Sequence, residues 1–160
     1  MKDDFTIREF EPGDASLVSH LHMIYYMKHY NFKGIFEHYV MKGISEFLKN
    51  PNKSQLWIAV KENKIVGSIA IVNISDETAQ LRWFIVDNEM QGRGLGNKLM
   101  DKAMDFCKEN CYKKIFLWTF DSLDAARHLY KKHGFIPIET QENNEWSSNI
   151  ILEEKWELNL

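Results

Sequence analysis

The sequence predicts a mixed α/β protein in which helices flank one central, mixed β-sheet. Segments with apolar residues at helical spacing alternate with short extended segments, and turns separate them. No repeat, low-complexity tract or linker divides the 160 residues. A length of about 150 residues is usual for one domain, and a hydrophobic share of 44% can supply its core. We therefore expect a single domain over residues 1–160.

The first half of the chain predicts a strand, two helices and a hairpin. In chain order we expect a strand over 6–10, a helix from residue 14, a helix over 34–49, and strands over 56–60 and 65–74. Asp14 follows a Pro-Gly turn and is expected to cap the first helix. The apolar face of that helix is expected at Leu17, Leu21, Ile24 and Tyr25. The second helix is predicted by Phe36, Val40, Ile44 and Phe47, and Pro51 should end it.

The second half predicts four strands and two helices. The first strand, 78–86, should alternate between a face with Ala79, Leu81, Trp83 and Ile85 and a face with Gln80, Arg82, Phe84 and Val86. A glycine-rich turn over 91–96 and a helix follow, then a strand over 114–120, a helix over 122–132, and strands over 135–139 and 149–158. Gly134 suits a left-handed helix cap, and Pro137 indicates a strand with an unpaired side.

Composition excludes several classes of function. A net charge of −3 disfavours general nucleic-acid binding, and no apolar run is long enough to cross a membrane. The N-terminus carries acidic residues where a secretory leader needs basic ones, and Cys107 and Cys111 cannot build a disulfide scaffold. We therefore expect a cytoplasmic protein. The six histidines show no spacing typical of metal ligands, so no metal is expected.

The glycine-rich turn is the most specific motif. It reads Gln91-Gly92-Arg93-Gly94-Leu95-Gly96 and lies between a predicted strand and a predicted helix. Glycines allow close approach of a ligand, and the free N–H groups of a helix start favour phosphate. Spacing excludes a P-loop, and a dinucleotide motif would need glycine where Asn97 or Leu99 stands. The alternative is a tight turn without a ligand.

This turn is similar to the Q/R-x-x-G-x-G/A motif of the GNAT acetyltransferases. The segment Leu129-Tyr130-Lys131-Lys132-His133-Gly134-Phe135 resembles the family's L-Y-x-x-x-G-F block, and the order of elements fits the family along nearly the whole chain. Segments 36–40, 79–84 and 117–130 resemble more narrowly the acetyltransferase half of MarR–GNAT fusion proteins. The winged-helix half of such fusions is not found in this sequence.

The resemblance implies a splayed GNAT-like sheet that binds acetyl-CoA. The pyrophosphate is expected on the backbone amides of Gln91, Gly92, Arg93, Gly94, Leu95, Gly96 and Asn97. The pantetheine arm is expected beside Ile85 and Val86, in a gap between strands 78–86 and 114–120.

The resemblance also implies roles in the reaction. An amine attacks the thioester, the Val86 N–H stabilises the oxyanion, and Tyr130 donates a proton to the departing thiolate. A buried core tyrosine is the alternative for Tyr130. Many family members carry a carboxylate base where this chain has Gln80 and Arg82. The candidates for the base are then Glu37, Glu77 or a chain of waters.

An acceptor site is expected near the end of the first helix. Tyr25, Tyr26, Tyr30 and Phe32 are too many rings to bury cheaply with their hydroxyls unpaired, so some should line the acceptor pocket. Arg82 is a candidate partner for a substrate carboxylate, and a cross-strand ion pair is the alternative.

The sequence as a whole predicts transfer of an acetyl group from acetyl-CoA to a primary amine of a small molecule. A protein amino group is a less favoured acceptor. The rival interpretations are a non-catalytic acetyl-CoA-binding regulatory module and a nucleotide-phosphate binder outside this family. A homodimer is expected only from the general prevalence of such assemblies.

Overall fold

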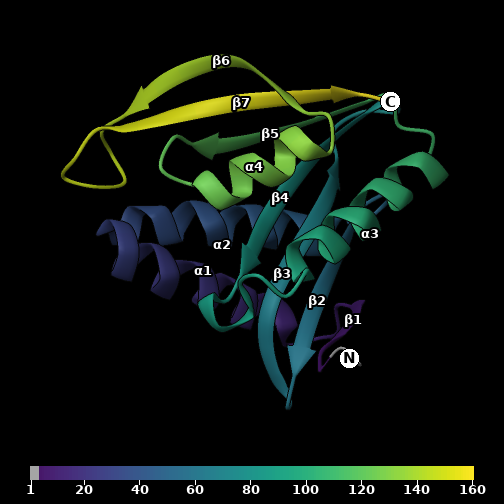
Figure 1. The fold of residues 1–160 in the computed structure, drawn as a ribbon, viewed down its shortest axis with the longest axis horizontal. Helices are drawn as coiled ribbons and strands as arrows, with labels where there is room; N and C mark the ends of the chain where they lie inside the picture. The colour runs from purple at the N-terminus through teal and green to yellow at the C-terminus, as the bar shows by residue number, and fades with distance from the viewer. Residues whose placement is uncertain (1–3) are drawn as a thin grey trace.

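The computed structural model describes residues 4–160; residues 1–3 of the acidic N-terminus lie outside the described part. The elements, in chain order, are β1 (Thr6–Glu9), α1 (Asp14–Tyr30), α2 (Gly34–Lys49), β2 (Gln55–Lys61), β3 (Lys64–Asn73), β4 (Thr78–Val86), the 3₁₀ turn η1 (Asn88–Met90), α3 (Leu95–Glu109), β5 (Lys114–Phe120), α4 (Asp124–Lys132), β6 (Ile136–Asn143) and β7 (Ile151–Asn159). They form one central mixed sheet flanked by helices, as the sequence predicts (Figure 1).

The sheet divides at its centre. Its seven strands run in the order β1-β2-β3-β4-β5-β7-β6, and β4 with β5 is the one parallel pair among them. These two strands are in register only where Thr78–Gln80 pairs with Lys114–Phe116. Beyond Gln80 they diverge, as Figure 1 shows for the two arrows. The later part of β4 therefore has a partner on the β3 side and none on the β5 side.

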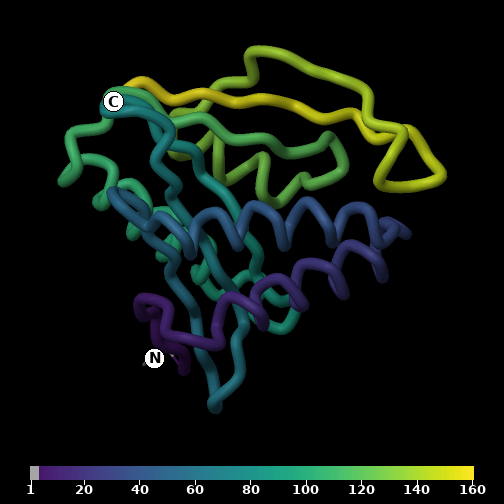
Figure 2. Tube along the Cα trace, turned by 180° about the vertical axis from the view of Figure 1, so that it is seen from behind, coloured from purple at the N-terminus to yellow at the C-terminus, as the bar shows by residue number. Residues whose placement is uncertain are grey.

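Helices cover both faces of the sheet. On one face lie α3 and α4, whose buried residues, such as Leu99 and Tyr130, join the larger core. On the other face lie α1 and α2 (Figure 2). Their residues Val18 and Phe47 pack on β2 and β4. Among the described residues, no helix has the length and apolar content that a membrane span requires.

A β-bulge in β4 changes the predicted alternation of its side chains. Ala70 of β3 pairs with Arg82 but Ser68 pairs with Ile85, so β4 carries one extra residue there. Trp83 takes a positive φ of 48°, and its carbonyl accepts a 2.7 Å hydrogen bond from the buried Ser68 hydroxyl. Leu81 joins the core on the α3 side, whereas Trp83 joins the core on the α2 side. The predicted common face of Leu81 and Trp83 is therefore wrong, because the inserted residue shifts the period of two.

The predicted apolar face of α1 is also wrong. Leu17 and Ile24 are exposed, and the buried face instead carries Val18, His22 and Tyr26. The helix packs against the sheet and against aromatic side chains. Its buried face therefore includes polar residues such as Ser19 and His22 beside the apolar ones.

The ends of several elements differ from the predictions. Gly13 is the cap of α1, and Asp14 instead accepts hydrogen bonds from the Glu11 N–H and from Arg8 at 2.7 and 2.6 Å. Helix α4 begins at residue 124, and β6 and β7 extend further toward the C-terminus than expected. Strand β6 is an edge strand, which agrees with the unpaired side expected at Pro137.

The close approach of β3 to β4 gives a test of this packing. A Cβ on Gly67 would lie 2.9 Å from the Ile85 carbonyl oxygen, whereas a Cβ on Gly34 meets nothing within 4 Å. We expect Gly67→Ala to lower the free energy of unfolding by about 1–3 kcal/mol, because backbone must move. Gly34→Ala, the control, should leave it unchanged or raise it by up to about 1 kcal/mol. Urea unfolding of both variants measures the difference. Equal stabilities would show that the close approach of β3 to β4 does not require glycine at position 67.

Candidate active site

A cavity of about 1080 Å³ lies where β4 and β5 diverge. Its walls come from α1 and α2 on one side of the sheet, from α3 and α4 on the other, and from the facing edges of the two strands. The cavity therefore passes through the gap in the sheet and joins surfaces that a continuous sheet would separate.

The glycine-rich turn forms one end of the cavity. Gly92 and Gly94 have φ of 75° and 80°, and Gly94 is the left-handed N-cap of α3. The N–H groups of Leu95, Gly96 and Asn97 open the helix and so have no acceptor within it. Helix starts attract anions because their free N–H groups can donate hydrogen bonds to the anion and because the positive end of the helix dipole lies there. The geometry fits the predicted pyrophosphate site.

The other predicted residues of the turn divide into two groups. Gln91, Gly92, Gly94, Leu95, Gly96 and Asn97 all line the cavity. The Arg93 side chain does not; it forms a 2.9 Å ion pair with Asp4 at the surface. Gln91 donates a 3.3 Å hydrogen bond to the Val86 carbonyl, which ties the turn to the end of β4.

Helices α3 and α4 touch at Gly96. A Cβ there would lie 2.7 Å from Leu129 Cδ1, so a larger residue would push α4 away. Lys132 adds a 3.1 Å hydrogen bond to the Asn97 side chain. These contacts fix the position of Tyr130, the residue that follows Leu129.

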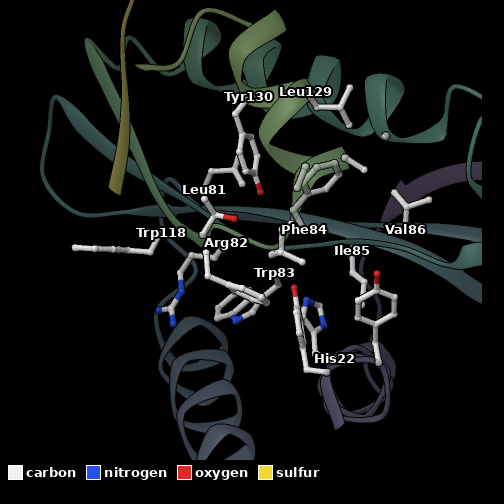
Figure 3. Close-up of a pocket in the computed structure, with 18 of the residues that line it drawn as sticks. His22, Leu81, Arg82, Trp83, Phe84, Ile85, Val86, Trp118, Leu129 and Tyr130 are labelled. Carbon is white, nitrogen blue, oxygen red and sulfur yellow. The ribbon is translucent and has the colours of Figure 1, made fainter. Parts of the chain in front are cut away.

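Tyr130 directs its hydroxyl into the cavity. Its ring is buried against Phe84, Phe135 and Trp156, with ring centroids 6.0 to 6.2 Å apart. The hydroxyl has no hydrogen-bond partner within residues 4–160, and Figure 3 shows it pointing toward β4. Burial raises the pKa of Tyr130 above its usual value, so the phenol keeps its proton at neutral pH.

The edge of β4 presents a free backbone donor to the same space. Asp87 donates its N–H to Val66 of β3 at 2.8 Å, and successive N–H groups along a strand point to opposite edges. The Val86 N–H therefore points toward the gap, where β5 no longer pairs. Ile85 and Val86 both line the cavity.

Aromatic side chains form the opposite end. Tyr25, Tyr26 and Tyr30 line the cavity, together with Phe36 and Trp146, whereas Phe32 lies behind Tyr26 with ring centroids 5.4 Å apart. Burial raises the pKa of Tyr26, and the nearby hydroxyl of Tyr130 raises it further. These two tyrosines line the cavity from α1 and from α4.

His22 is a cavity residue that sequence reasoning missed. Its Nδ1 lies 2.8 Å from the Val18 carbonyl oxygen, so Nδ1 carries the proton and Nε2 is a free acceptor. Nε2 is buried and has no partner, and burial lowers the pKa of His22 to about 4. The only available signal was its position one helical turn before Tyr26, whose ring centroid lies 6.2 Å away. Thr119 of β5 is a second missed residue, since its hydroxyl is also buried without a partner.

Arg82 lines the cavity, but the two candidate glutamates do not. The Arg82 guanidinium lies 4.8 Å from the Trp83 ring centroid and against Gly43 of α2. Glu37 is half-buried on α2 and does not line the cavity, although its neighbours Phe36 and Tyr39 do. Glu77 is at the far end of β4, where it pairs with Lys113.

Within the described residues, no cluster of histidine, cysteine or carboxylate side chains could hold a metal ion.

Comparison with known proteins agrees with this geometry. Residues 15–135 match the model of the Acetyltransferase (GNAT) family. An N-acetylaspartate synthetase of Xenopus tropicalis is 34% identical over 96 residues, which cover 59% of this chain and 35% of that protein. Streptothricin acetyltransferase A of Bacillus subtilis is 33% identical over 75 residues, which cover 47% of this chain and 43% of that one. The chain thus spans less than half the length of these relatives.

Solved structures share the whole fold. An acetyltransferase from Streptococcus agalactiae superposes with a TM-score of 0.76 at 24% identity, covering 99% of this chain and 100% of that one. A GNAT family acetyltransferase from Elizabethkingia anophelis with acetyl-CoA bound has a TM-score of 0.66 at 20% identity, covering 99% and 100%. The narrower resemblance to MarR–GNAT fusions is not shown by these comparisons. The match over most of the chain, with the splayed sheet and the glycine-rich turn, shows that this protein belongs to the Acetyltransferase (GNAT) family.

Proposed function

We propose that the protein transfers the acetyl group of acetyl-CoA to a primary amine of a small molecule, by direct attack in a ternary complex. One observation carries the proposal: a single cavity joins the start of helix α3, whose first N–H groups have no acceptor in the helix, a free N–H on a parted strand and the hydroxyl of a buried tyrosine. Acetyl-CoA bound to a relative of the same fold supports the choice of donor.

The cavity has the parts that acetyl-CoA requires. The pyrophosphate would accept hydrogen bonds from the N–H groups of Leu95, Gly96 and Asn97. The pantetheine arm, which carries amide groups, would lie along the unpaired edge of β4 at Ile85 and Val86. A strand edge within a sheet needs hydrogen-bond partners, and the arm supplies them.

The reaction then needs two hydrogen donors, one for the oxyanion that forms on the carbonyl oxygen and one for the departing thiolate. The amine nitrogen forms a bond to the thioester carbon, and the carbonyl oxygen becomes an anion that the Val86 N–H stabilises. As the carbon–sulfur bond breaks, Tyr130 donates its proton to the thiolate. The products are the amide and coenzyme A with a protonated thiol.

The amine proton needs an acceptor, and His22 is better placed than the glutamates. Its Nε2 is an unpaired acceptor beside Tyr26, and both residues line the cavity together with Tyr130. The imidazole is neutral at neutral pH because burial disfavours its charge. An oxyanion that forms in the same cavity favours the imidazolium, so proton uptake becomes easier as the bond forms. Water is the alternative acceptor.

Turnover separates this proposal from its rivals. Purified protein is incubated with acetyl-CoA and a panel of small amines, and release of free thiol is measured. We expect thiol release that depends on the amine. Acetyl-CoA binding without turnover would favour the non-catalytic module, and tighter binding of ATP than of coenzyme A would favour a nucleotide binder.

The role of Tyr130 can be tested by removing its hydroxyl. We expect Tyr130→Phe to lower kcat by about 100- to 10,000-fold, the range for loss of a general acid. The dissociation constant for coenzyme A should change little, because the ring remains. Tyr112→Phe is the control: this buried hydroxyl donates to Lys53 outside the cavity, so its loss should affect stability but not rate. Unchanged turnover in Tyr130→Phe would remove the acid role.

The role of His22 is tested by His22→Asn. The asparagine amide can still donate to the Val18 carbonyl, but no atom remains at the place of Nε2. We expect kcat to fall about 100-fold or more while coenzyme A affinity is kept. His20→Asn changes an exposed histidine of the same helix and should act like the unaltered protein. Full activity of His22→Asn would mean that water takes the proton.

A further inference from the structure

We propose that the acceptor amine also carries a carboxylate, which Arg82 binds at the α2 side of the cavity. The inference rests on the proposed function for the acetyl transfer, and it adds the chemical class of the acceptor.

The Arg82 guanidinium is largely buried and has no close acidic partner. Within residues 4–160 it makes no hydrogen bond and no ion pair. Glu46 acts on it only at longer range, and this carboxylate is exposed to solvent. Buried charges are normally paired, because an unpaired one loses its hydration without compensation. Burial accordingly lowers the pKa of Arg82, although arginine still keeps its proton. An anion in the cavity would supply the missing partner.

Two features of the fold hold the guanidinium in place. A Cβ on Gly43 would lie 2.7 Å from Nη2, so this helix position must be glycine for the group to sit there. Glycine inside a helix costs about 0.5–1 kcal/mol relative to alanine, and the space for Arg82 explains why it is tolerated. The β4 bulge places Trp83 on the same side, where its ring stacks with the guanidinium at 4.8 Å. Figure 3 shows the Arg82 side chain directed toward α2 beside Trp83.

The position of Arg82 points to the acceptor rather than the cofactor. The pyrophosphate has its own site at the helix start of α3, on the other side of Val86 along the chain. Arg82 lies earlier on β4, on the side of the sheet that α1 and α2 cover with the aromatic wall. A planar guanidinium pairs well with a carboxylate through two parallel hydrogen bonds. The name of the N-acetylaspartate synthetase relatives denotes an acetylated amine that bears carboxylates, which supports this class.

A series of acceptors with increasing distance between the amine and the carboxylate tests the proposal. Each of glycine, β-alanine, γ-aminobutyrate and ε-aminocaproate is compared with the alkylamine that lacks its carboxylate, and L-aspartate is added to the series. We expect at least one amino acid to be acetylated with a kcat/KM about 10- to 100-fold above its alkylamine, the range of a hydrogen bond to a charged group. The best spacing reports the distance from Arg82 to the reacting carbon.

Two variants and two controls test whether that preference depends on Arg82. Arg82→Gln should remove the preference, so that each amino acid is acetylated with about the same kcat/KM as its alkylamine in this variant. Gly43→Ala keeps the charge but displaces the flexible guanidinium, so it should reduce the preference without loss of stability. Lys42→Gln, which removes an exposed cation next to Gly43, and Gly34→Ala, which fills open space on α2, are the controls.

Equilibrium binding separates this inference from the catalytic proposal. The Nε–H resonance of Arg82, assigned by its absence in Arg82→Gln, is followed by NMR while the N-acetyl derivatives of the same five amino acids are added, one at a time, in the presence of coenzyme A. A saturable shift supports the carboxylate site even if no amine is turned over. Equal rates for amino acids and alkylamines would overturn the inference while the transferase function stands. An unchanged Arg82 resonance would overturn it whatever the rates.

Discussion

The parting of β4 from β5 is the constraint on which the rest of this molecule depends. A sheet that opens at its centre leaves backbone N–H and carbonyl groups without partners in the interior, where such groups are costly. Helices flank the opening on both faces of the sheet, and their side chains line the resulting cavity together with the edges of the two strands. A ligand with its own amides can complete the hydrogen bonding, so the defect in the sheet and the binding site are the same feature.

The bulge in β4 serves the same opening. With one extra residue against β3, the strand places Arg82 and Trp83 on the α2 side and then returns to its pairing at Ile85. The buried Ser68 hydroxyl holds the distorted carbonyl of Trp83, so the irregularity is built in. Without it, the strand could not present a cation, an aromatic platform and a free Val86 N–H within five residues.

Sequence reasoning predicts the parts of this protein that depend on local chemistry. The glycine-rich turn, the helix after it and Tyr130 could be placed because their motif and periodicity are local, and nearly all of the turn's predicted residues line the cavity. The bulge could not be predicted, since tryptophan is not a residue that favours positive φ. The buried face of α1 was missed because its core contacts include His22, whose burial depends on distant partners. Glu37 looked suitable on its own helix, but the orientation of α2 keeps it out of the cavity.

The lack of a carboxylate on β4 has a physical consequence for the whole site. On this strand the chain has Gln80 and an unpaired Arg82. A cation there cannot take a proton from an amine, but it can attract a substrate anion. On the proposed function, proton acceptance must then move across the gap to α1, where the cavity offers the neutral Nε2 of His22. On these proposals the two features are coupled, because a carboxylate held by Arg82 would add negative charge to the cavity and thereby favour a protonated imidazole. Substrate recognition and the relocation of the base would thus be two effects of one substituted strand.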